Sequence, residues 1–525
     1  MPAPGANLQH VTHFPFAKYR PGQQEALDAA RAAFDDGKRF VVLEAPTGAG
    51  KSALAVTLAR EAASAYLVTA QKLLQDQYLG DFPDLASMRG RSNYECLVAD
   101  THAAEAPCTV GVTLPGCEAC PYFTAKDEAI AASRTVLNYP YALAEAQHAG
   151  MFEPRELLVL DEAHGIEAAL MRFVQVELDD ASFRRAGLSA TVPQGDHAWT
   201  LIEWALDLLP DLQEALAQVE GQAKAVRPTG REAIGLYRQR RWLEGRMAAI
   251  QWMIDSVENE EADWVVETDR RGDAGRMVRF RPVDVASFAE PLLFHYGRRV
   301  LLMSATVLNV PTFLRTLGVR ESQAEHVTVA STFPPERRPV RLHPVADLRR
   351  ATLERDLPKL VEETARIMAD HPEEKGVIHA HSYKIARAIA DGLPPHLQKR
   401  LRLHDAAAGR DDALRHHRTS VEPTVLLSPS MTEGVNLAGD DARFQVLCKV
   451  PWPYLGDAQV KARKEREPEW YAWQAAVRLV QAYGRSVRSE DDHAVTYLLD
   501  ATFPAFIKRQ AHLLPVWFHE AVDPP

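Results

Sequence analysis

The stretch Glu44-Ala45-Pro46-Thr47-Gly48-Ala49-Gly50-Lys51-Ser52 stands between a short apolar run and a helix-forming run. The apolar β-branched residues 40–43 predict a buried strand, and residues 53–59 predict the first turns of a helix. The two glycines let the backbone curl so that its N–H groups converge on a polyphosphate, and the helix N-terminus adds partial positive charge. The stretch therefore predicts a phosphate-binding loop, from which the rest of the chain is interpreted.

Particular roles follow for the side chains of this loop. Lys51 is expected to reach the β- and γ-phosphates of a nucleotide, and the Ser52 hydroxyl to ligate Mg²⁺. The backbone of Thr47, Gly48, Ala49 and Gly50 is expected to surround the phosphates. The strict pattern begins with glycine where this chain has Ala45, and a Gly-rich tight turn is the alternative interpretation.

Gln23 precedes the loop, next to an amphipathic helix predicted over residues 24–34. A carboxamide can donate to and accept from the adenine edge at the same time, so Gln23 is a candidate for base recognition. The alternative is that it is simply the first residue of the helix.

The composition indicates a globular protein, and we expect it to remain in the cytoplasm. The chain has 525 residues, of which 46% are hydrophobic and 25% charged, enough for about three or four domains. We find no apolar run of transmembrane length and no basic-then-apolar signal at the N-terminus, so no membrane association is expected; if the source is bacterial, we expect association with the nucleoid. The net charge of −11 argues against wholesale wrapping of nucleic acid but allows a local basic groove.

Two further strands are expected to end in functional side chains. Residues 157–160 form an apolar run that delivers Asp161 and Glu162 at its carboxyl end. Opposite a phosphate loop, Asp161 is expected to hold the Mg²⁺ shell and Glu162 to orient and deprotonate the attacking water. Residues 65–70 form the other strand, and Thr69 at its end either meets a nucleic-acid backbone or helps to cap the next helix.

Four of the five cysteines lie within 25 residues, which indicates a metal site and not a disulfide scaffold. They are Cys96, Cys108, Cys117 and Cys120. Four thiolates suit either Zn²⁺ or an iron-sulfur cluster. The spacing favours iron-sulfur, because only the last pair is close, and zinc stays open. The fifth, Cys448, is expected to be an inert core thiol.

Residues 167–280 change character and predict a mostly helical insertion. Residues 199–226 and 231–260 have apolar residues at helical spacing, and residues 264–267 and 277–280 are short β-like runs. Its arginines either line a strand path or lie on a solvated helix face. They are Arg238, Arg240, Arg241, Arg270, Arg271, Arg276 and Arg279.

A second strand–helix alternation, without a second phosphate loop, follows a Pro/Arg-rich linker predicted over residues 331–344. Before that linker, residues 299–306 predict a strand ending in Ser304-Ala305-Thr306. The second alternation carries Glu433 and Gly434, and later Gln481, Arg485 and Arg488. Arg485 and Arg488 share a helix face, where they would point at a γ-phosphate held by the first half or form surface ion pairs.

The order of these motifs resembles superfamily 2 helicases, and more narrowly the XPD/DinG family of iron-sulfur DNA helicases. Residues 90–96 and Cys120-Pro121-Tyr122 are similar to that family's cluster domain, and the insertion after His164 falls where its arch domain lies. The resemblance implies an α/β fold with two RecA-like parallel-sheet motor domains, the first of which carries an iron-sulfur domain and a mostly helical arch. Asn436 departs from the family pattern, in which an aspartate is usual.

The resemblance also implies domain boundaries, ligands and an activity. Motor domain 1 spans residues 1–90, 133–166 and 281–330; the cluster domain spans 91–132, the arch 167–280 and motor domain 2 331–525. The implied cofactors are ATP, Mg²⁺ and a [4Fe-4S] cluster on the four cysteines. Lys51, Asp161, Glu162, Gln481, Arg485 and Arg488 would be catalytic, and Glu433 and Gly434 would contact the nucleotide or strand.

The implied activity is ATP-driven movement along single-stranded DNA, usually 5′ to 3′, in repair or recombination, by a monomer acting on forked or tailed duplexes. Tyr94, Tyr122 and Phe123 are candidates for base stacking or for core packing. A different class remains possible on the motor motifs alone: a nucleotide-switched protein that clamps or remodels nucleic acid without unwinding it.

Overall fold

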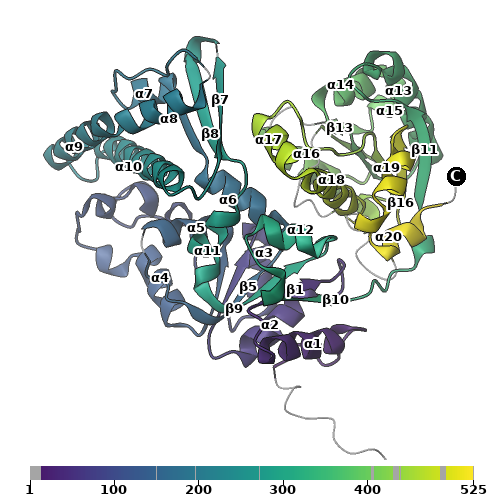
Figure 1. Cartoon of the computed structure of the whole chain (residues 1–525), viewed down its shortest axis with the longest axis horizontal. Coiled ribbons are helices and arrows are strands. Elements are labelled where there is room, and N and C mark those ends of the chain that lie inside the picture. Colours follow the sequence, from purple (N-terminus) through teal and green to yellow (C-terminus); the bar gives the residue numbers. More distant parts are fainter. Residues whose placement is uncertain are drawn as a thin grey trace, which may run out of the picture.

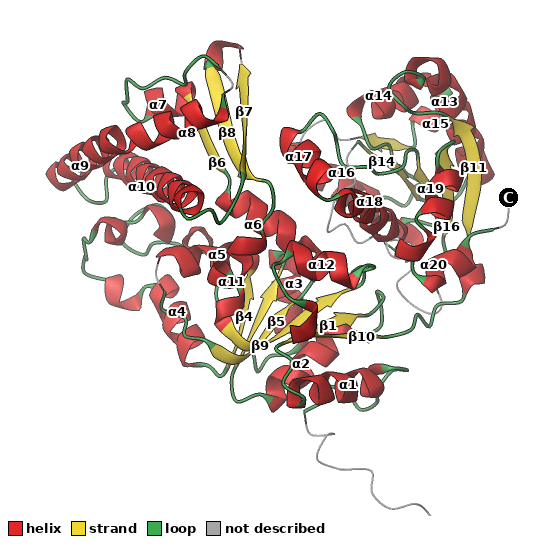
Figure 2. Cartoon of the chain, in the orientation of Figure 1, coloured by secondary structure: helices red, strands yellow, loops and turns green. Residues whose placement is uncertain are grey.

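The computed structural model of the chain describes residues 13–148, 150–195, 197–270, 272–403, 407–429, 437, 439–484 and 492–523. Two parallel sheets lie side by side, and a helical insertion lies against the first of them (Figure 1). Figure 2 shows helices surrounding each sheet.

The first sheet has seven strands, all parallel, in the order β10-β1-β9-β5-β2-β4-β3. Its strands are β1 (Phe40–Glu44), β2 (Ala65–Thr69), β3 (Ala86–Ser87), β4 (Arg134–Asn138), β5 (Arg155–Leu160), β9 (Gly297–Ser304) and β10 (Ala324–Thr328). Strand β1 is apolar on both faces because helices cover both. Val41 and Leu43 belong to one core and Phe40 and Val42 to the other.

Helices connect and cover these strands. They are α1 (Gln23–Asp35), α2 (Lys51–Glu61), α3 (Lys72–Asp81), α4 (Pro121–Ala131), α5 (Tyr139–His148), α6 (Ile166–Val174), α11 (Ala286–Leu292) and α12 (Val310–Thr316). Helices α1 and α2 share one core with the sheet, and α5, α6, α11 and α12 share the other. Because the strands are parallel, their carboxyl ends all meet at one edge, which is where the predicted site residues come together.

The second sheet has six parallel strands in the order β11-β16-β15-β12-β14-β13. Its strands are β11 (Val340–Ala346), β12 (Gly376–His379), β13 (Leu401–Leu403), β14 (Val425–Ser428), β15 (Phe444–Leu447) and β16 (Val495–Asp500). Its helices are α13 (Leu353–Asp370), α14 (Tyr383–Gly392), α15 (Pro395–Gln398), α16 (Ala407–Thr419), α17 (Ala458–Arg466), α18 (Pro468–Tyr483), α19 (Phe503–Arg509) and α20 (Val516–Ala521). Cys448 follows β15 and is fully buried, as expected of a core thiol.

The insertion combines a helical layer with a small antiparallel sheet, ordered β6-β8-β7. Its strands are β6 (Val176–Asp179), β7 (Trp264–Arg270) and β8 (Arg276–Pro282), and its helices are α7 (Asp180–Arg185), α8 (Ala198–Asp207), α9 (Leu209–Ala225) and α10 (Arg231–Glu258). The long α10 packs against α9, and the two form the arm at the upper left of Figure 1.

The predicted linker over residues 331–344 is wrong in its second half. Residues from Val340 onward form β11, which pairs in parallel with β16 at the edge of the second sheet. The register shifts between Leu342 and Ala346, and Pro344 lies in that irregular stretch. A proline, which lacks a backbone N–H, is tolerated on an edge strand or at a bulge, and this is why the proline-rich sequence misled the prediction.

The fold class is confirmed: two parallel α/β sheets form two motor-like domains, with a mostly helical insertion in the first. The individual domain boundaries remain predictions. No described helix is long and apolar enough to cross a membrane.

Candidate active site

The phosphate-binding loop follows β1 directly and ends where α2 begins, at Lys51. Gly48 and Gly50 have φ angles of 83° and 80°, the left-handed conformation that side chains disfavour. A Cβ atom built on Gly50 would lie 2.4 Å from the Gln23 Nε2 atom. The backbone conformation therefore favours glycine at position 50, and a side chain there would also displace the Gln23 amide.

Gln23 holds the loop through its side-chain amide. It is 2% exposed, and its Nε2 donates to the carbonyl oxygens of Ala49 (2.8 Å) and Gly50 (3.4 Å). Its Oε1 accepts from the Arg20 backbone N–H at 2.8 Å. The predicted contact with adenine would exchange these bonds, and it stays a prediction.

The Lys51 ammonium folds back over the loop and donates to the Ala45 carbonyl oxygen at 3.2 Å. Thr47, Ala49 and Ser52 are half-buried around it. Lys51 thus lies within the phosphate loop, and its charge is close enough to the Asp161 carboxylate to lower the pKa of that group.

Strand register brings those carboxylates to the loop. Strand β9 lies between β1 and β5, with Glu44 opposite Ser304 and Leu160 opposite Leu302. Asp161, the next residue after β5, is therefore one strand removed from the start of the loop. The sheet assembles loop, carboxylates and Ser304 at one edge, as the parallel arrangement predicts.

Asp161 is a buried carboxylate, 5% exposed, with a hydrogen bond on each oxygen. Its Oδ1 accepts from the Glu162 backbone N–H at 2.9 Å and its Oδ2 from the Tyr78 hydroxyl at 3.0 Å. Burial raises the pKa of Asp161 to about 6; the Glu162 charge acts in the same direction, and Lys51 opposes both. The nearby Lys51 favours the ionised form of Asp161, and an ionised carboxylate oxygen is a ligand that Mg²⁺ prefers.

Glu162 occupies a left-handed conformation, with φ of 52° and ψ of 47°. A non-glycine residue in this region is strained, and such strain occurs preferentially at functional sites. The turn directs the Glu162 carboxylate to 3.4 Å from His164 Nδ1, and the Glu162 side chain is 32% exposed. The Glu162 side chain is thus much more accessible to water at the sheet edge than the buried Asp161.

A chain of polar contacts links this turn to the second domain. His164 Nδ1 lies 2.9 Å from Ser304 Oγ, and Ser304 Oγ accepts from the Thr306 backbone N–H at 3.0 Å. The Gln481 Nε2 on α18 donates to Thr306 Oγ1 at 3.4 Å. Gln481 therefore contacts the first domain directly, which the sequence alone could not place.

Helix α18 is anchored to the first domain by further contacts. Glu167, buried on α6 just after the carboxylate turn, accepts from Trp470 Nε1 at 2.9 Å and from Gln474 Nε2 at 2.7 Å. The Trp473 indole N–H donates to the Val307 carbonyl oxygen at 2.8 Å. The two domains thus meet through α18 beside the carboxylates.

Sequence reasoning missed Tyr78, Tyr139 and Glu44. The Tyr139 hydroxyl donates to the Asp161 backbone oxygen at 3.0 Å. Glu44 Oε1 accepts from the backbone N–H groups of Val307 (2.8 Å) and Leu308 (2.9 Å). A charged residue ending an otherwise apolar strand was the available signal for Glu44, whereas the tyrosines gave none.

Several predicted residues have other placements. Glu433, Gly434, Asn436, Arg485, Arg488 and Arg271 lie outside the described residues. Thr69 is fully buried, and its hydroxyl donates to the backbone oxygens of Gln71 (3.2 Å) and Leu137 (3.4 Å), so it does not cap α3, while its contact with a nucleic-acid strand stays a prediction.

Several arginines of the insertion form ion pairs within the protein. Arg238 pairs with Glu105 at 2.8 Å, Arg240 with Glu220 at 2.9 Å, and Arg279 with Glu177 at 2.9 Å. These arginines are therefore less available to nucleic acid than the sequence suggested. The pair between Arg238 and Glu105 also joins α10 to the cysteine-bearing segment.

The four clustered cysteines lie in a segment of short 3₁₀ turns between β3 and α4, and all four are free and partly exposed. The Cys117 sulfur accepts from the Leu114 backbone N–H at 3.4 Å, and Arg91 Nη1 lies 3.8 Å from the Cys108 sulfur. Burial raises the pKa of Cys108, as do the nearby Cys120 and Cys96, while Arg91 lowers it. Over the part of the chain that the structure describes, no group of three or more potential ligands has metal-binding geometry.

The aromatic candidates in this segment mainly pack against one another. Tyr122 is 3% exposed and makes edge contacts with Tyr94 (5.7 Å between centroids) and Phe123 (5.3 Å). Phe123 alone is substantially exposed, at 41%. Core packing therefore accounts for Tyr122.

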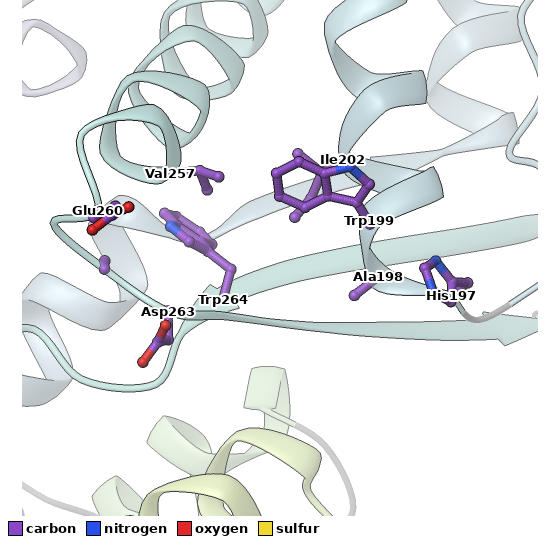
Figure 3. A pocket seen from close by; sticks show the side chains of 9 residues that line it. His197, Ala198, Trp199, Ile202, Val257, Glu260, Asp263 and Trp264 are labelled. Atoms are coloured by element: carbon purple, nitrogen blue, oxygen red, sulfur yellow. The ribbon is translucent and has the colours of Figure 1, made fainter.

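A separate pocket of 960 Å³ lies in the insertion, between the start of α8, the end of α10 and the start of β7 (Figure 3). Trp199 and Trp264 contribute its aromatic lining, and Glu260 and Asp263 its acidic lining. None of the phosphate-loop residues lines it, so the pocket is distinct from the candidate active site.

Comparison with known proteins agrees with this geometry. Residues 16–194 match the family model described as type III restriction enzyme, res subunit, and residues 365–521 match that of the helicase C-terminal domain. The chain is 22% identical over 502 residues to the ATP-dependent DNA helicase DinG of Photobacterium profundum, covering 77% of this chain and 70% of that protein. It is 30% identical over 102 residues to the regulator of telomere elongation helicase 1 homolog of Anopheles gambiae, covering 17% and 10%.

Among solved structures, an XPD helicase superposes with a TM-score of 0.65 at 14% identity, covering 95% of this chain and 99% of that one. An XPD protein of S. tokodaii gives a TM-score of 0.58 at 16% identity, with coverage of 95% and 99%. At these identities the structures establish the fold.

The two parallel-sheet domains, the phosphate loop and the paired carboxylates define an ATP-dependent helicase with two motor domains. Its fold is that of the XPD helicase structures, and its sequence is similar to the helicase DinG.

Proposed function

We propose that the protein translocates along single-stranded DNA, 5′ to 3′, and unwinds forked or tailed duplexes, with a structural [4Fe-4S] cluster and a role in repair or recombination. The observation that carries the proposal is the placement of Gln481 of the second domain against Thr306 of the first, beside the carboxylate turn. We therefore expect that the binding and hydrolysis of ATP at this edge of the sheet move the second domain relative to the first.

The residues present fit ATP and Mg²⁺. Lys51 and the loop backbone would bind the phosphates, and Ser52 and Asp161 would hold the metal ion, which would neutralise developing phosphate charge. Glu162 would accept the proton of the attacking water, because its carboxylate is exposed at the sheet edge whereas that of Asp161 is buried. His164 fixes that carboxylate from one side.

Asp161 makes the metal requirement dependent on pH. A carboxyl must be ionised to bind Mg²⁺, and its pKa is raised to about 6, so it takes up a proton as the pH falls through that value. We expect the Mg²⁺ concentration for half-maximal ATPase activity to rise severalfold between about pH 7.5 and about pH 5.5. Magnesium titrations of the steady-state rate at each pH measure this, and an unchanged requirement would contradict the role of Asp161.

The cysteine set fits an iron-sulfur cluster in its donor chemistry. Four free thiols lie in one small segment, and the sulfurs of Cys108 and Cys117 have neighbouring N–H groups such as stabilise cluster thiolates. We propose that Cys96, Cys108, Cys117 and Cys120 hold the cluster and thereby order the segment that splits the duplex. Iron and sulfide analysis of anaerobically purified protein distinguishes the cluster from zinc.

Cys117 provides the functional test of the cluster. We expect Cys117→Ser to lose the cluster's visible absorption and at least about tenfold in unwinding rate, while strand-stimulated ATPase stays within about threefold. The matched control is Cys448→Ser, since Cys448 lies in the second domain, far from the segment in sequence, and should retain the cluster absorption. Full unwinding by a cluster-free Cys117→Ser protein would exclude this role.

A strand-displacement assay tests the function as a whole. A 5′-tailed DNA duplex should be unwound in an ATP-dependent manner, a 3′-tailed duplex should not, and an RNA duplex should be a poor substrate. Nucleotide-dependent binding without displacement on any substrate would instead favour the clamp or remodelling function.

A further inference from the structure

One buried hydroxyl touches both residues assigned to the metal ion. The Tyr78 hydroxyl donates to Asp161 Oδ2 at 3.0 Å and also interacts with the Ser52 side chain. Tyr78 is 2% exposed, so water does not compete for this contact. The backbone N–H of Glu162 holds the other oxygen of the same carboxylate at 2.9 Å.

The carboxylate is thus oriented from both sides. An ionised carboxyl group has about four acceptor positions, of which these two donors use two and leave the others for a metal ion or its water. Mg²⁺ demands near-ideal octahedral geometry, so a ligand fixed in one rotamer binds it better than a mobile one.

Helix α3 keeps Tyr78 in place. The Tyr78 ring packs against Phe82, with 6.0 Å between centroids. On the same helix Gln75 is fully buried, and its Nε2 donates to the Met88 backbone oxygen at 2.9 Å. The hydroxyl therefore comes from a rigid element and not from a loop.

A second buried tyrosine provides a natural comparison. Tyr139 is also 2% exposed and also donates to Asp161, but to its backbone oxygen, at 3.0 Å. It stabilises the end of β5 without touching the carboxylate. The two tyrosines differ in the one contact that matters for the metal.

We propose that Tyr78 is a positioning residue for the metal site, whose hydroxyl orients the Asp161 carboxylate and the Ser52 hydroxyl for Mg²⁺. The proposal rests on the proposed ATP site. Tyr78 takes no part in the chemistry of hydrolysis; it acts through Asp161 and Ser52.

The test compares Tyr78→Phe with Tyr139→Phe in the full-length protein. The affinity for fluorescent MANT-ADP is measured by titration in Mg²⁺ and again in EDTA. We expect Tyr78→Phe to weaken binding in Mg²⁺ by about tenfold and to leave binding in EDTA within about twofold of the unmodified protein. Tyr139→Phe should leave the ratio of the two affinities unchanged.

This ratio is internal to each protein, so a partial loss of folded protein lowers both values alike and does not imitate the effect. An unchanged ratio in Tyr78→Phe, or a tighter affinity in Mg²⁺, overturns the proposal. An equal change of the ratio in Tyr139→Phe overturns it as well. If the unmodified protein binds no nucleotide under either condition, the ATP site itself is wrong, which is a different result from a failure of Tyr78 alone.

Discussion

Replacing Glu162 by glutamine is expected to lower the kcat of ATP hydrolysis by about 10²- to 10⁴-fold, while the protein stays folded and still binds ATP. The amide keeps the size of the side chain and removes its ability to take a proton. Glu162 is held in a strained turn at φ 52° with its carboxylate partly exposed, whereas the adjacent Asp161 is buried. Steady-state ATPase assays with and without single-stranded DNA measure the loss.

The matched control is Glu156→Gln, near the start of β5, the strand whose other end leads to Glu162. Glu156 accepts a hydrogen bond from the Ala63 backbone N–H at 2.7 Å, a bond that the glutamine oxygen can also accept. This variant should retain ATPase activity within about twofold, as expected of a surface substitution. Near-normal turnover by Glu162→Gln would refute the assignment of the general base.

Replacing Arg463 by alanine is expected to destabilise the contact between the two domains by about 3–5 kcal/mol. Arg463 on α17 is 1% exposed and forms ion pairs with Asp284 at 3.0 Å and Glu467 at 3.1 Å. Its guanidinium also lies 5.6 Å from the centre of the Trp470 ring. The substitution removes the buried cation that lies between Asp284 and Glu467, and only the exposed Arg466, 3.6 Å from Asp284, remains near the first of them. Urea unfolding followed by tryptophan fluorescence measures the change.

Arg466, one turn further along α17, is the control. It pairs with Asp263 at 2.8 Å and more distantly with Asp284 at 3.6 Å, but it is 51% exposed, so water screens both ion pairs. Arg466→Ala should cost less than about 1 kcal/mol. Equal destabilisation by the two variants would show that burial of Arg463 does not decide the stability of this contact.

The two buried sheets were predictable because their strands are short apolar runs that end in characteristic residues. Every predicted strand that carries the ATP-site motifs is present, with boundaries shifted by a few residues. The edge strand β11 was missed, since Pro344 and the surrounding arginines resemble a linker when the neighbouring β16 is unknown. Edge strands bury little, so their sequence carries less of the apolar signal.

The individual contacts of site residues were harder to predict than their positions. Gln23 was proposed from the sequence as an adenine ligand; its amide contacts the loop backbone, which the sequence did not show, and the adenine contact stays a prediction. Thr69 was proposed either as a contact of the nucleic-acid strand or as a helix cap; its hydroxyl donates to backbone oxygens, which is not a cap, and the strand contact stays a prediction. The sequence specifies which side chain can form a hydrogen bond, whereas its hydrogen-bond partner depends on which segments fold next to it.

By itself, the sequence determined the phosphate loop, the carboxylate pair and the number of parallel sheets, because each depends on local spacing and on apolar runs that must be buried. The tertiary structure alone decided that Tyr78 and Tyr139 donate to Asp161 and that Gln481 reaches Thr306. Those contacts join residues 22 to 175 positions apart, and only the order and register of the parallel strands bring such residues to one edge.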